Sequence, residues 1–383
     1  MNKVFDYILD GVRALYPGED RVPLSVPVFA GNEKKYLAEC IDTTFVSSVG
    51  PFVDRFERDI AAYTGAKRAV VCVNGTSALH MALMLAGVER GDIVLTQALT
   101  FVATCNALSY IGADPVFIDI DEHTLSLSPK ALRRWLEANA VMSNGECRER
   151  LSDRRIKAVV PMHTFGHPAD LDGIIAVCEE WGLELVEDAA ESIGSLYHGR
   201  HTGTFGKVGA LSFNGNKTIT TGGGGMLLFN DEEMAAHAKH LTTQAKVAHP
   251  WRFVHDEVGY NYRMPNINAA LGCAQLEQID GFISSKRATA AGYEELLRDV
   301  QGVRFVKEPE GTRSNYWLNA IVFDKPDDAE AFLEYSNNRG VMTRPAWELM
   351  CNLPMWSHCK NDGLEVTRRI ASRLVNVPSS VRL

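Results

Sequence analysis

Residues Gly209 to Met226 read GALSFNGNKTITTGGGGM. The stretch begins as a short apolar strand, continues into Lys217 and ends in four consecutive glycines, Gly222 to Gly225. A phosphate-binding P-loop needs a glycine directly before its lysine, whereas Asn216 stands there and the glycines follow. This pattern excludes a P-loop and leaves two interpretations, a functional lysine beyond a strand or an ordinary surface lysine.

Predicted strands and helices alternate on the N-terminal side of this stretch. After a first helix at 4–15, strands are predicted at 68–73, 93–96, 115–119, 156–161, 183–187 and 210–213, with helices at 77–86, 102–111 and 171–181. This alternation indicates an α/β protein with a parallel sheet. Beyond Tyr262 we expect one long helix from 267 through 283 and onward, strands at 303–306 and 317–323, and helices at 329–339 and 365–374. We therefore predict an N-terminal helix and arm (1–25), a large domain (26–262) and a smaller α+β domain (263–383).

Composition excludes several classes of protein. The chain has 383 residues, of which 46% are hydrophobic and 23% charged, as in a globular protein. A formal net charge of −9 argues against a nucleic-acid partner. No apolar run approaches the ~20 residues that span a bilayer, and Asp6 and Asp10 interrupt the pattern of a signal peptide. We expect a cytoplasmic protein without a membrane partner.

Cysteine and histidine spacing argues against disulfides and metals. The eight cysteines contain no Cys-x-x-Cys pair, which is typical of reduced thiols. The histidine pairs 163/167 and 198/201 have no third ligand nearby in the sequence. We therefore expect no metal site.

Two further stretches of the sequence are candidates for a ligand-binding site. Residues 183–192, LELVEDAAES, end an apolar strand at Asp188, and ligands of parallel α/β sheets bind at such strand ends. Asp188 could equally cap the next helix. Residues 74–79, NGTSAL, lead from a strand into a helix, and backbone N–H groups at a helix start bind phosphate well. An ordinary helix cap has the same sequence pattern.

In chain order, these three stretches resemble the pyridoxal-phosphate enzymes of fold type I. The segments NGTSAL (74–79), EDAAES (187–192), SFNGNK (212–217) and GYNYRM (259–264) are similar to the DegT/DnrJ/EryC1/StrS family of sugar aminotransferases. The resemblance covers about Val26 to Arg344 and implies a three-layer large domain with a smaller C-terminal α+β domain. The N-terminal helix and the sequence of residues 213–217, FNGNK, resemble those of the family's legionaminic acid and bacillosamine subgroup of enzymes.

The resemblance also assigns roles in binding pyridoxal phosphate. It implies that Lys217 bonds covalently to the cofactor and then shuttles a proton, and that Asp188 keeps the pyridine nitrogen protonated. Phe101 is expected to stack on the ring, although a plain core phenylalanine is the alternative. The residues implied to hold the phosphate are Gly75, Thr76, Ser77 and Ser212, with Asn261 reaching in from the other subunit of a homodimer.

Four more residues are candidates for the same pocket. Glu191 stands where many family members have Gln or His, near the cofactor's O3′; we expect it to be protonated with a raised pKa, bridged by water, or turned away. His163 follows a strand end and is either part of the pocket or a hydrogen-bonded structural histidine. Arg344 and Trp347 are candidates for contacts with the donor carboxylate or the sugar nucleotide, although surface arginines are common.

The implied function is an amino transfer from glutamate to a nucleotide-linked 4-keto-6-deoxy sugar, in bacterial surface-glycan synthesis. We expect a UDP-linked sugar derived from N-acetylglucosamine, with a GDP- or dTDP-linked sugar as the alternative. Other fold type I enzymes, such as desulfurases or aldolases, and a non-catalytic regulatory homologue are the rival interpretations. Lys217 argues against the family's dehydratases, in which histidine replaces the lysine.

Overall fold

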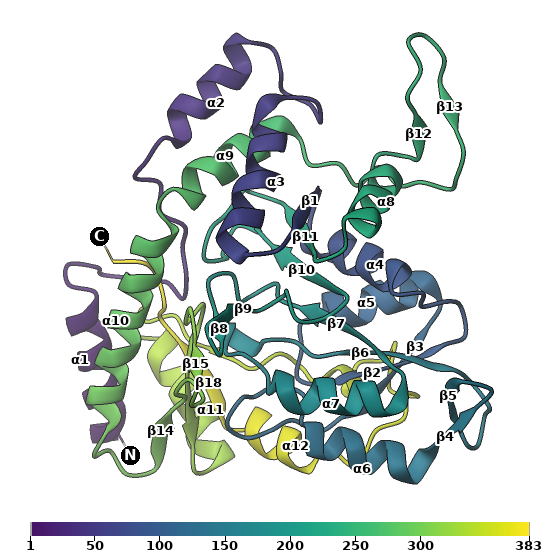
Figure 1. Cartoon of the computed structure of the whole chain (residues 1–383). Helices are drawn as coiled ribbons and strands as arrows, with labels where there is room; N and C mark the ends of the chain where they lie inside the picture. Colours follow the sequence, from purple (N-terminus) through teal and green to yellow (C-terminus); the bar gives the residue numbers. More distant parts are fainter. Residues whose placement is uncertain (1, 383) are drawn as a thin grey trace.

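A seven-stranded sheet forms the centre of the computed structural model, which describes residues 2–382 (Figure 1). Its strand order is β1-β11-β10-β7-β6-β2-β3. From β10 to β3 all neighbours pair in parallel. The strands are β1 Arg68–Cys72, β2 Ile93–Gln97, β3 Asp114–Ile118, β6 Ile156–Val160, β7 Glu184–Asp188, β10 Val208–Ser212 and β11 Gly225–Phe229.

The sequence analysis missed β11, which pairs antiparallel with both β1 and β10, so the predicted strand at β1 joins the sheet through an antiparallel neighbour. A parallel pair needs a crossover connection of about a dozen residues or more, usually a helix. Residues 213–224 connect β10 to β11 without a helix, so the chain returns antiparallel. This connection contains Lys217.

Helices cover both faces of the sheet, because successive strand residues point to opposite sides. Val70 packs against the helices of one face, while its neighbour Val71 packs against those of the other. The first face carries α4 (Gly75–Leu85), α5 (Val102–Ile111) and α8 (Glu232–Thr242). The second carries α3 (Pro51–Thr64), α6 (Pro129–Asn139), α7 (Leu171–Trp181) and α9 (Asn266–Leu276). The predicted three-layer α/β architecture is confirmed.

A second, four-stranded antiparallel sheet of order β14-β16-β18-β17 lies in the C-terminal part of the chain. Its strands are β14 Val303–Phe305, β16 Asn319–Phe323, β17 Arg344–Pro345 and β18 Leu374–Val377. The N-terminal helix α1 (Asn2–Leu15) packs with this sheet and against α10 (Ile279–Leu297), as Figure 1 shows at the left. The remaining helices of this part are α11 (Pro326–Asn337) and α12 (Glu365–Ala371).

Smaller elements complete the chain. A hairpin of β12 and β13 projects from the body beside α8 (Figure 1, upper right). The other elements are α2 Glu33–Asp42, β4 Ala140–Ser143, β5 Glu146–Glu149, β8 Leu196–Tyr197, β9 Arg200–His201, β12 Lys246–Val247, β13 Val254–His255, β15 Thr312–Arg313 and the 3₁₀ helices Thr164–Gly166 and Met350–Asn352.

The long helix predicted from residue 267 is two helices, α9 and α10, separated by Glu277 and Gln278. Contacts from the N-terminal segment hold this break. The Tyr36 hydroxyl donates to Glu277 at 2.6 Å, and Gln278 donates to Glu33 at 2.7 Å. The predicted helix 365–374 also ends early, because Leu374 pairs with Val322 of β16.

None of the helices among residues 2–382 has the length and apolarity needed to cross a membrane. The predicted domain boundaries at 25/26 and 262/263 stay predictions, and residues 1 and 383, the outer limits of those domains, lie outside the described residues.

Candidate active site

A cavity of about 300 Å³ opens at the carboxyl ends of β7 and β10. This is the sheet edge at which parallel α/β proteins bind ligands. The start of α4, the start of α5 and two residues from the C-terminal part complete its wall. The lining residues are Asn74, Gly75, Thr76, Leu79, Phe101, Ala103, Met162, Asp188, Ala190, Glu191, Ser212, Asn214, Asn216, Lys217, Gly224, Trp317 and Trp347.

Asp188 is the last residue of β7, and its carboxylate is almost completely buried. Oδ2 accepts a hydrogen bond from the Thr104 hydroxyl at 2.7 Å, and Oδ1 accepts one from the Ala190 N–H at 3.2 Å. Burial raises the pKa of Asp188, despite the opposing effect of these hydrogen bonds and of Lys217. A desolvated carboxylate at a cavity wall is well suited to hold a cationic group.

Lys217 and Glu191 meet across the cavity, with 3.2 Å between Nζ and Oε1. The other oxygen of Glu191 accepts the backbone N–H of Phe165 at 2.9 Å. Burial, with a smaller effect of the nearby Asp188, outweighs the lowering effects of Lys217 and the Phe165 N–H, and the resulting pKa of Glu191 is raised to about 7. Glu191 therefore faces the site with a raised pKa and is not turned away, while its protonation beside the cofactor stays a prediction.

The turn before α4 is built to let another group approach its backbone. The Asn74 side chain accepts the Ser77 N–H at 2.8 Å and so caps the helix. A Cβ atom on Gly75 would lie 2.8 Å from the Ser212 Cβ, and one on Gly225 would lie 2.4 Å from the Asn74 carbonyl oxygen. Glycine is therefore required at both positions, and the N-terminus of α4 is left facing the cavity.

The cavity suits the pyridoxal phosphate that the resemblance implies. The lining contains a helix N-terminus that matches a phosphate, a buried carboxylate that matches a protonated ring nitrogen, and a lysine amine. Phe101 lies in the lining, half exposed, with its ring in edge contact with Trp347 at a centroid distance of 6.4 Å. The fit rests on this donor set.

Most of the predicted site residues gather at the cavity. Eight residues line it as expected, namely Gly75, Thr76, Phe101, Asp188, Glu191, Ser212, Lys217 and Trp347. Ser77 lies directly behind the turn, buried, with its N–H bound to Asn74.

Three other predicted residues lie outside this lining. Asn261 is exposed on the chain's surface, where its side chain accepts from Arg263 at 3.1 Å. Arg344 is exposed on β17 and donates to Asn337 at 3.1 Å. The third is His163, which is fully buried.

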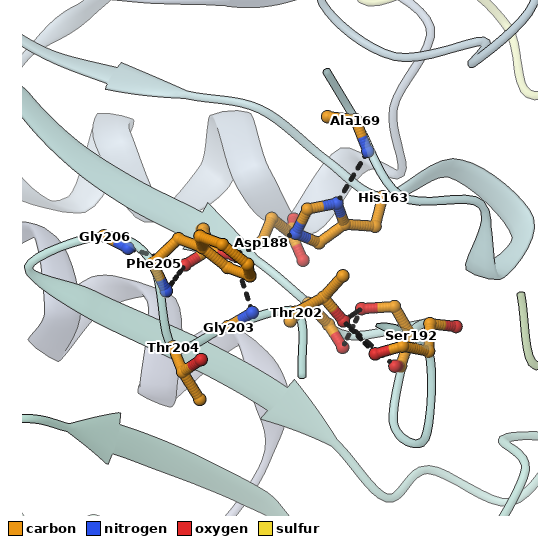
Figure 2. Close-up of polar contacts among 12 residues, drawn as sticks. His163, Ala169, Asp188, Ser192, Thr202, Gly203, Thr204, Phe205 and Gly206 are labelled. Carbon is orange, nitrogen blue, oxygen red and sulfur yellow. Dashed lines mark hydrogen bonds and ion pairs between the residues drawn. The ribbon is translucent and has the colours of Figure 1, made fainter. Parts of the chain in front are cut away.

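His163 is held in a hydrogen-bonded network beneath the site (Figure 2). Its Nδ1 accepts the Ala169 N–H at 3.1 Å, so Nε2 carries the proton and donates to Glu187 at 3.2 Å. Both ring nitrogens are therefore occupied. The structure places His163 in the structural role that was the alternative interpretation.

The network centres on Glu187, the buried neighbour of Asp188 on β7. Its carboxylate also accepts backbone N–H groups of Gly203 at 2.6 Å and of Phe205 and Gly206 at 2.7 Å each. Burial raises the pKa of Glu187, but His163 and these N–H groups lower it more, and the net pKa lies below the usual value. The sequence marks this residue only as the end of a strand.

The sequence analysis missed three contributors. Thr104 orients Asp188 from the first turn of α5, and Asn216 lies next to Lys217 in the wall. Trp317, from the segment before β16, presents its ring to Lys217 with 3.9 Å from Nζ to the centroid. Asn216 stands inside a quoted motif, whereas no local pattern connects Trp317 with residues so distant in sequence.

Comparisons with known proteins agree with this geometry. The model of the DegT/DnrJ/EryC1/StrS aminotransferase family matches residues 28–383. The chain is 36% identical over 358 residues to the GDP-perosamine synthase of Escherichia coli O157:H7, a match that covers 94% of this chain and 93% of that protein. It is 38% identical over 336 residues to EpsN of Bacillus subtilis (strain 168), named as a pyridoxal phosphate-dependent aminotransferase, and this match covers 88% of the chain and 84% of EpsN.

Solved structures show the same fold. The aminotransferase TlmJ from Streptoalloteichus hindustanus superposes with a TM-score of 0.84 at 28% identity and covers 94% of this chain and 93% of its own. A DegT DnrJ EryC1 StrS aminotransferase from Brucella abortus gives a TM-score of 0.82 at 27% identity, with coverage of 91% and 90%. The relatives do not confirm the legionaminic acid and bacillosamine subgroup. The chain belongs to the DegT/DnrJ/EryC1/StrS aminotransferase family and is a pyridoxal-phosphate-dependent sugar aminotransferase of fold type I.

Proposed function

We propose that the enzyme transfers an amino group from glutamate to the keto carbon of a nucleotide-linked 4-keto-6-deoxy sugar. The observation that carries this proposal is the pairing of Lys217 with the buried Glu191, in a cavity at the strand ends that Asp188 also lines. When bound, pyridoxal phosphate supplies an aldehyde that accepts amines and a ring that takes up an electron pair. The chain must supply a proton carrier, a charge partner for the ring and a phosphate cradle.

In this proposal Lys217 is the proton carrier, since it lines the cavity and its amine is ion-paired there with Glu191. Asp188 is the charge partner of the ring nitrogen and is held in place by Thr104. Gly75, Thr76, Ser77 and Ser212 form the phosphate cradle at the start of α4.

The acceptor is the least constrained part of the proposal. We expected a UDP-linked sugar derived from N-acetylglucosamine, with a GDP-linked sugar as an alternative. The names of three relatives, GDP-perosamine synthases at 35–36% identity over 94% or more of this chain, favour the GDP-linked alternative. Trp347 lines the cavity, and its ring centroid lies 5.0 Å from that of Phe165. It is our candidate for stacking on the acceptor.

A substrate panel tests the proposal. The enzyme is first converted to its amine-carrying form with glutamate, then mixed with GDP-, UDP- and dTDP-linked 4-keto-6-deoxy sugars, and the return of the aldehyde form is followed by absorbance. We expect one nucleotide class to restore it in a single turnover. If none does, while amino acids are desulfurated or cleaved, a desulfurase or aldolase activity replaces the proposal.

The active site is also proposed to be shared in a homodimer. Asn261 does not line the cavity of its own chain, and its side chain is exposed. Large apolar side chains are exposed on the neighbouring hairpin, among them Trp251 at 77% and Phe253 at 81%. A two-fold interface would bury these side chains and bring Asn261 to the partner's phosphate cradle. Arg344 stays a proposed contact for the donor carboxylate.

A further inference from the structure

Trp317 gives the ε-amino group of Lys217 a second partner besides Glu191. The distance from Nζ to the indole centroid is 3.9 Å, and only 3% of Trp317 is exposed. A cation this close to an aromatic face is attracted by the negative charge of the π system. The ammonium therefore contacts both a carboxylate and the face of an aromatic ring.

The ring of Trp317 cannot turn away without losing a hydrogen bond. Its Nε1 donates to the carbonyl oxygen of Asn216 at 2.7 Å. Asn216 directly precedes Lys217, so the same tryptophan contacts both the side chain of the lysine and the peptide that leads into it. The orientation of the ring and the position of the lysine are coupled.

Asn315 sets the spacing between the two partners of the ammonium. Its Oδ1 accepts the Trp317 N–H at 2.8 Å, and its Nδ2 donates to the Glu191 carbonyl at 2.9 Å. Its Nδ2 also donates to the Ile193 carbonyl at 2.9 Å, and the residue is fully buried. One side chain thus joins the backbone of Trp317 to that of Glu191.

Lys286 also holds the Trp317 segment. It is a buried lysine of α10, and its Nζ donates to the Trp317 carbonyl at 3.2 Å and to the Ser379 carbonyl at 2.5 Å. Trp317 is therefore fixed at its N–H, its carbonyl and its ring nitrogen, which is more than packing of an apolar side chain requires.

We propose that Trp317 is a further catalytic residue, on which the ε-ammonium of Lys217 rests whenever the lysine is not bonded to the cofactor. Asn315 and Lys286 are positioning residues that act through Trp317. The inference rests on the role proposed for Lys217.

The contact between Trp317 and Lys217 matters for the proton transfer that we propose for the lysine. Once a substrate amine has replaced the lysine, the free amine of Lys217 takes the proton from the donor's α-carbon. The C–H bond breaks, its electron pair stays with the cofactor-bound substrate, and the nitrogen becomes an ammonium that later returns the proton to the other reacting carbon. The face of Trp317 stabilises the ammonium that this proton transfer forms on Lys217.

Fluorinated tryptophans at position 317 test the electrostatic part of this idea without an unfolded variant. Fluorine withdraws π density and nearly preserves the shape of the ring. We expect the single-turnover rate with glutamate to fall progressively, by about tenfold over the series, and the isotope effect with α-deuterated glutamate to rise. A rate and an isotope effect that do not depend on fluorination would overturn the proposal.

Labelling of the cofactor-free protein supplies a readout independent of turnover. Reductive methylation of Lys217, followed by peptide mapping, should be several-fold faster in Trp317→Leu than in the wild type. In Trp317→Phe the increase in this rate should be smaller, because an aromatic face remains. Lys286→Met should show a smaller increase, and Trp181→Phe, on α7 and away from the cavity, should show none. Equal labelling in Trp317→Leu and the wild type contradicts the proposal. Mapping the cofactor to a different lysine would instead refute the role of Lys217.

Discussion

Nζ of Lys217 lies 3.2 Å from Oε1 of Glu191, inside a cavity in which the carboxylate is almost completely buried. A titratable carboxyl group therefore faces the lysine. The neighbouring Asp188 carboxylate is buried as well and lines the same cavity. Two carboxylates and one amine thus share the site, and their protonation governs both its stability and its chemistry.

Glu191→Gln should change how stability depends on pH in the cofactor-free protein. The folded pKa of about 7 lies above the ordinary 4.5, so the wild-type residue contributes stability below pH 4.5 and loses that contribution as pH rises through 7. Relative to wild type, the variant should therefore gain roughly 3 kcal/mol in unfolding free energy between pH 4.5 and 8. Urea unfolding across this range measures the gain.

Glu187→Gln is the matched control for that experiment. The pKa of Glu187 is lowered, so its contribution to the unfolding free energy is lost only as pH falls below 4.5. The difference in unfolding free energy between Glu187→Gln and the wild type should therefore not change between pH 5 and 8. If the difference in unfolding free energy between Glu191→Gln and the wild type also does not change with pH, Glu191 is ionised throughout this range.

Lys217 should be the residue that carries the cofactor. Reduction of the loaded enzyme with borohydride should fix pyridoxal phosphate onto the peptide containing Lys217, and Lys217→Ala should lose activity by about 10²–10⁴-fold or more. Peptide mapping by mass spectrometry measures the first outcome. Cofactor attached to Lys207 or Lys286 instead would disprove the assignment.

Asp188→Asn should keep the fold and lower the turnover rate by about two orders of magnitude, because the ring nitrogen loses its anionic partner. Thr104→Val removes only the hydrogen bond that orients the carboxylate and should lower the rate by about tenfold. Steady-state kinetics and the cofactor's absorbance separate the two effects. Full activity in Asp188→Asn would leave Asp188 with a structural role alone.

Asn261 should act on the partner's active site. Lys217→Ala chains mixed with Asn261→Ala chains should regain activity, because each mixed dimer contains one site with an intact lysine and an intact asparagine. Sedimentation verifies that mixed dimers form, and the turnover assay measures recovery. Formation of mixed dimers without recovery would restrict Asn261 to its own chain.

Glu187→Ala should destabilise the fold strongly, because it leaves three backbone N–H groups and the His163 ring without their buried acceptor (Figure 2). We expect a loss of roughly 3–5 kcal/mol in unfolding free energy. Glu184→Ala, on the same strand but in partly exposed ion pairs with Lys157 and Lys207, should cost less than about 1 kcal/mol. Equal urea midpoints for the two variants would contradict this account.

Local patterns in the sequence were enough for much of the architecture and for the centre of the site. Alternation of apolar strands and amphipathic helices predicted the layered α/β part, because that pattern depends only on neighbouring residues. The proposed cofactor residues Asp188 and Ser212 stand at strand ends, and Lys217 lies in the connection that follows β10, so one rule about strand ends brings them to one edge of the sheet.

Contacts between distant segments decided the rest. The break between α9 and α10 is held by Tyr36 and Glu33, and β1 enters the sheet by pairing antiparallel with the distant β11. His163 belongs to a network with Glu187 and not to the cavity, because a buried imidazole needs partners on both nitrogens. Trp317 reaches Lys217 only because β16 and α10 place it there, and no periodicity or motif encodes a contact that depends on the packing of segments so far apart.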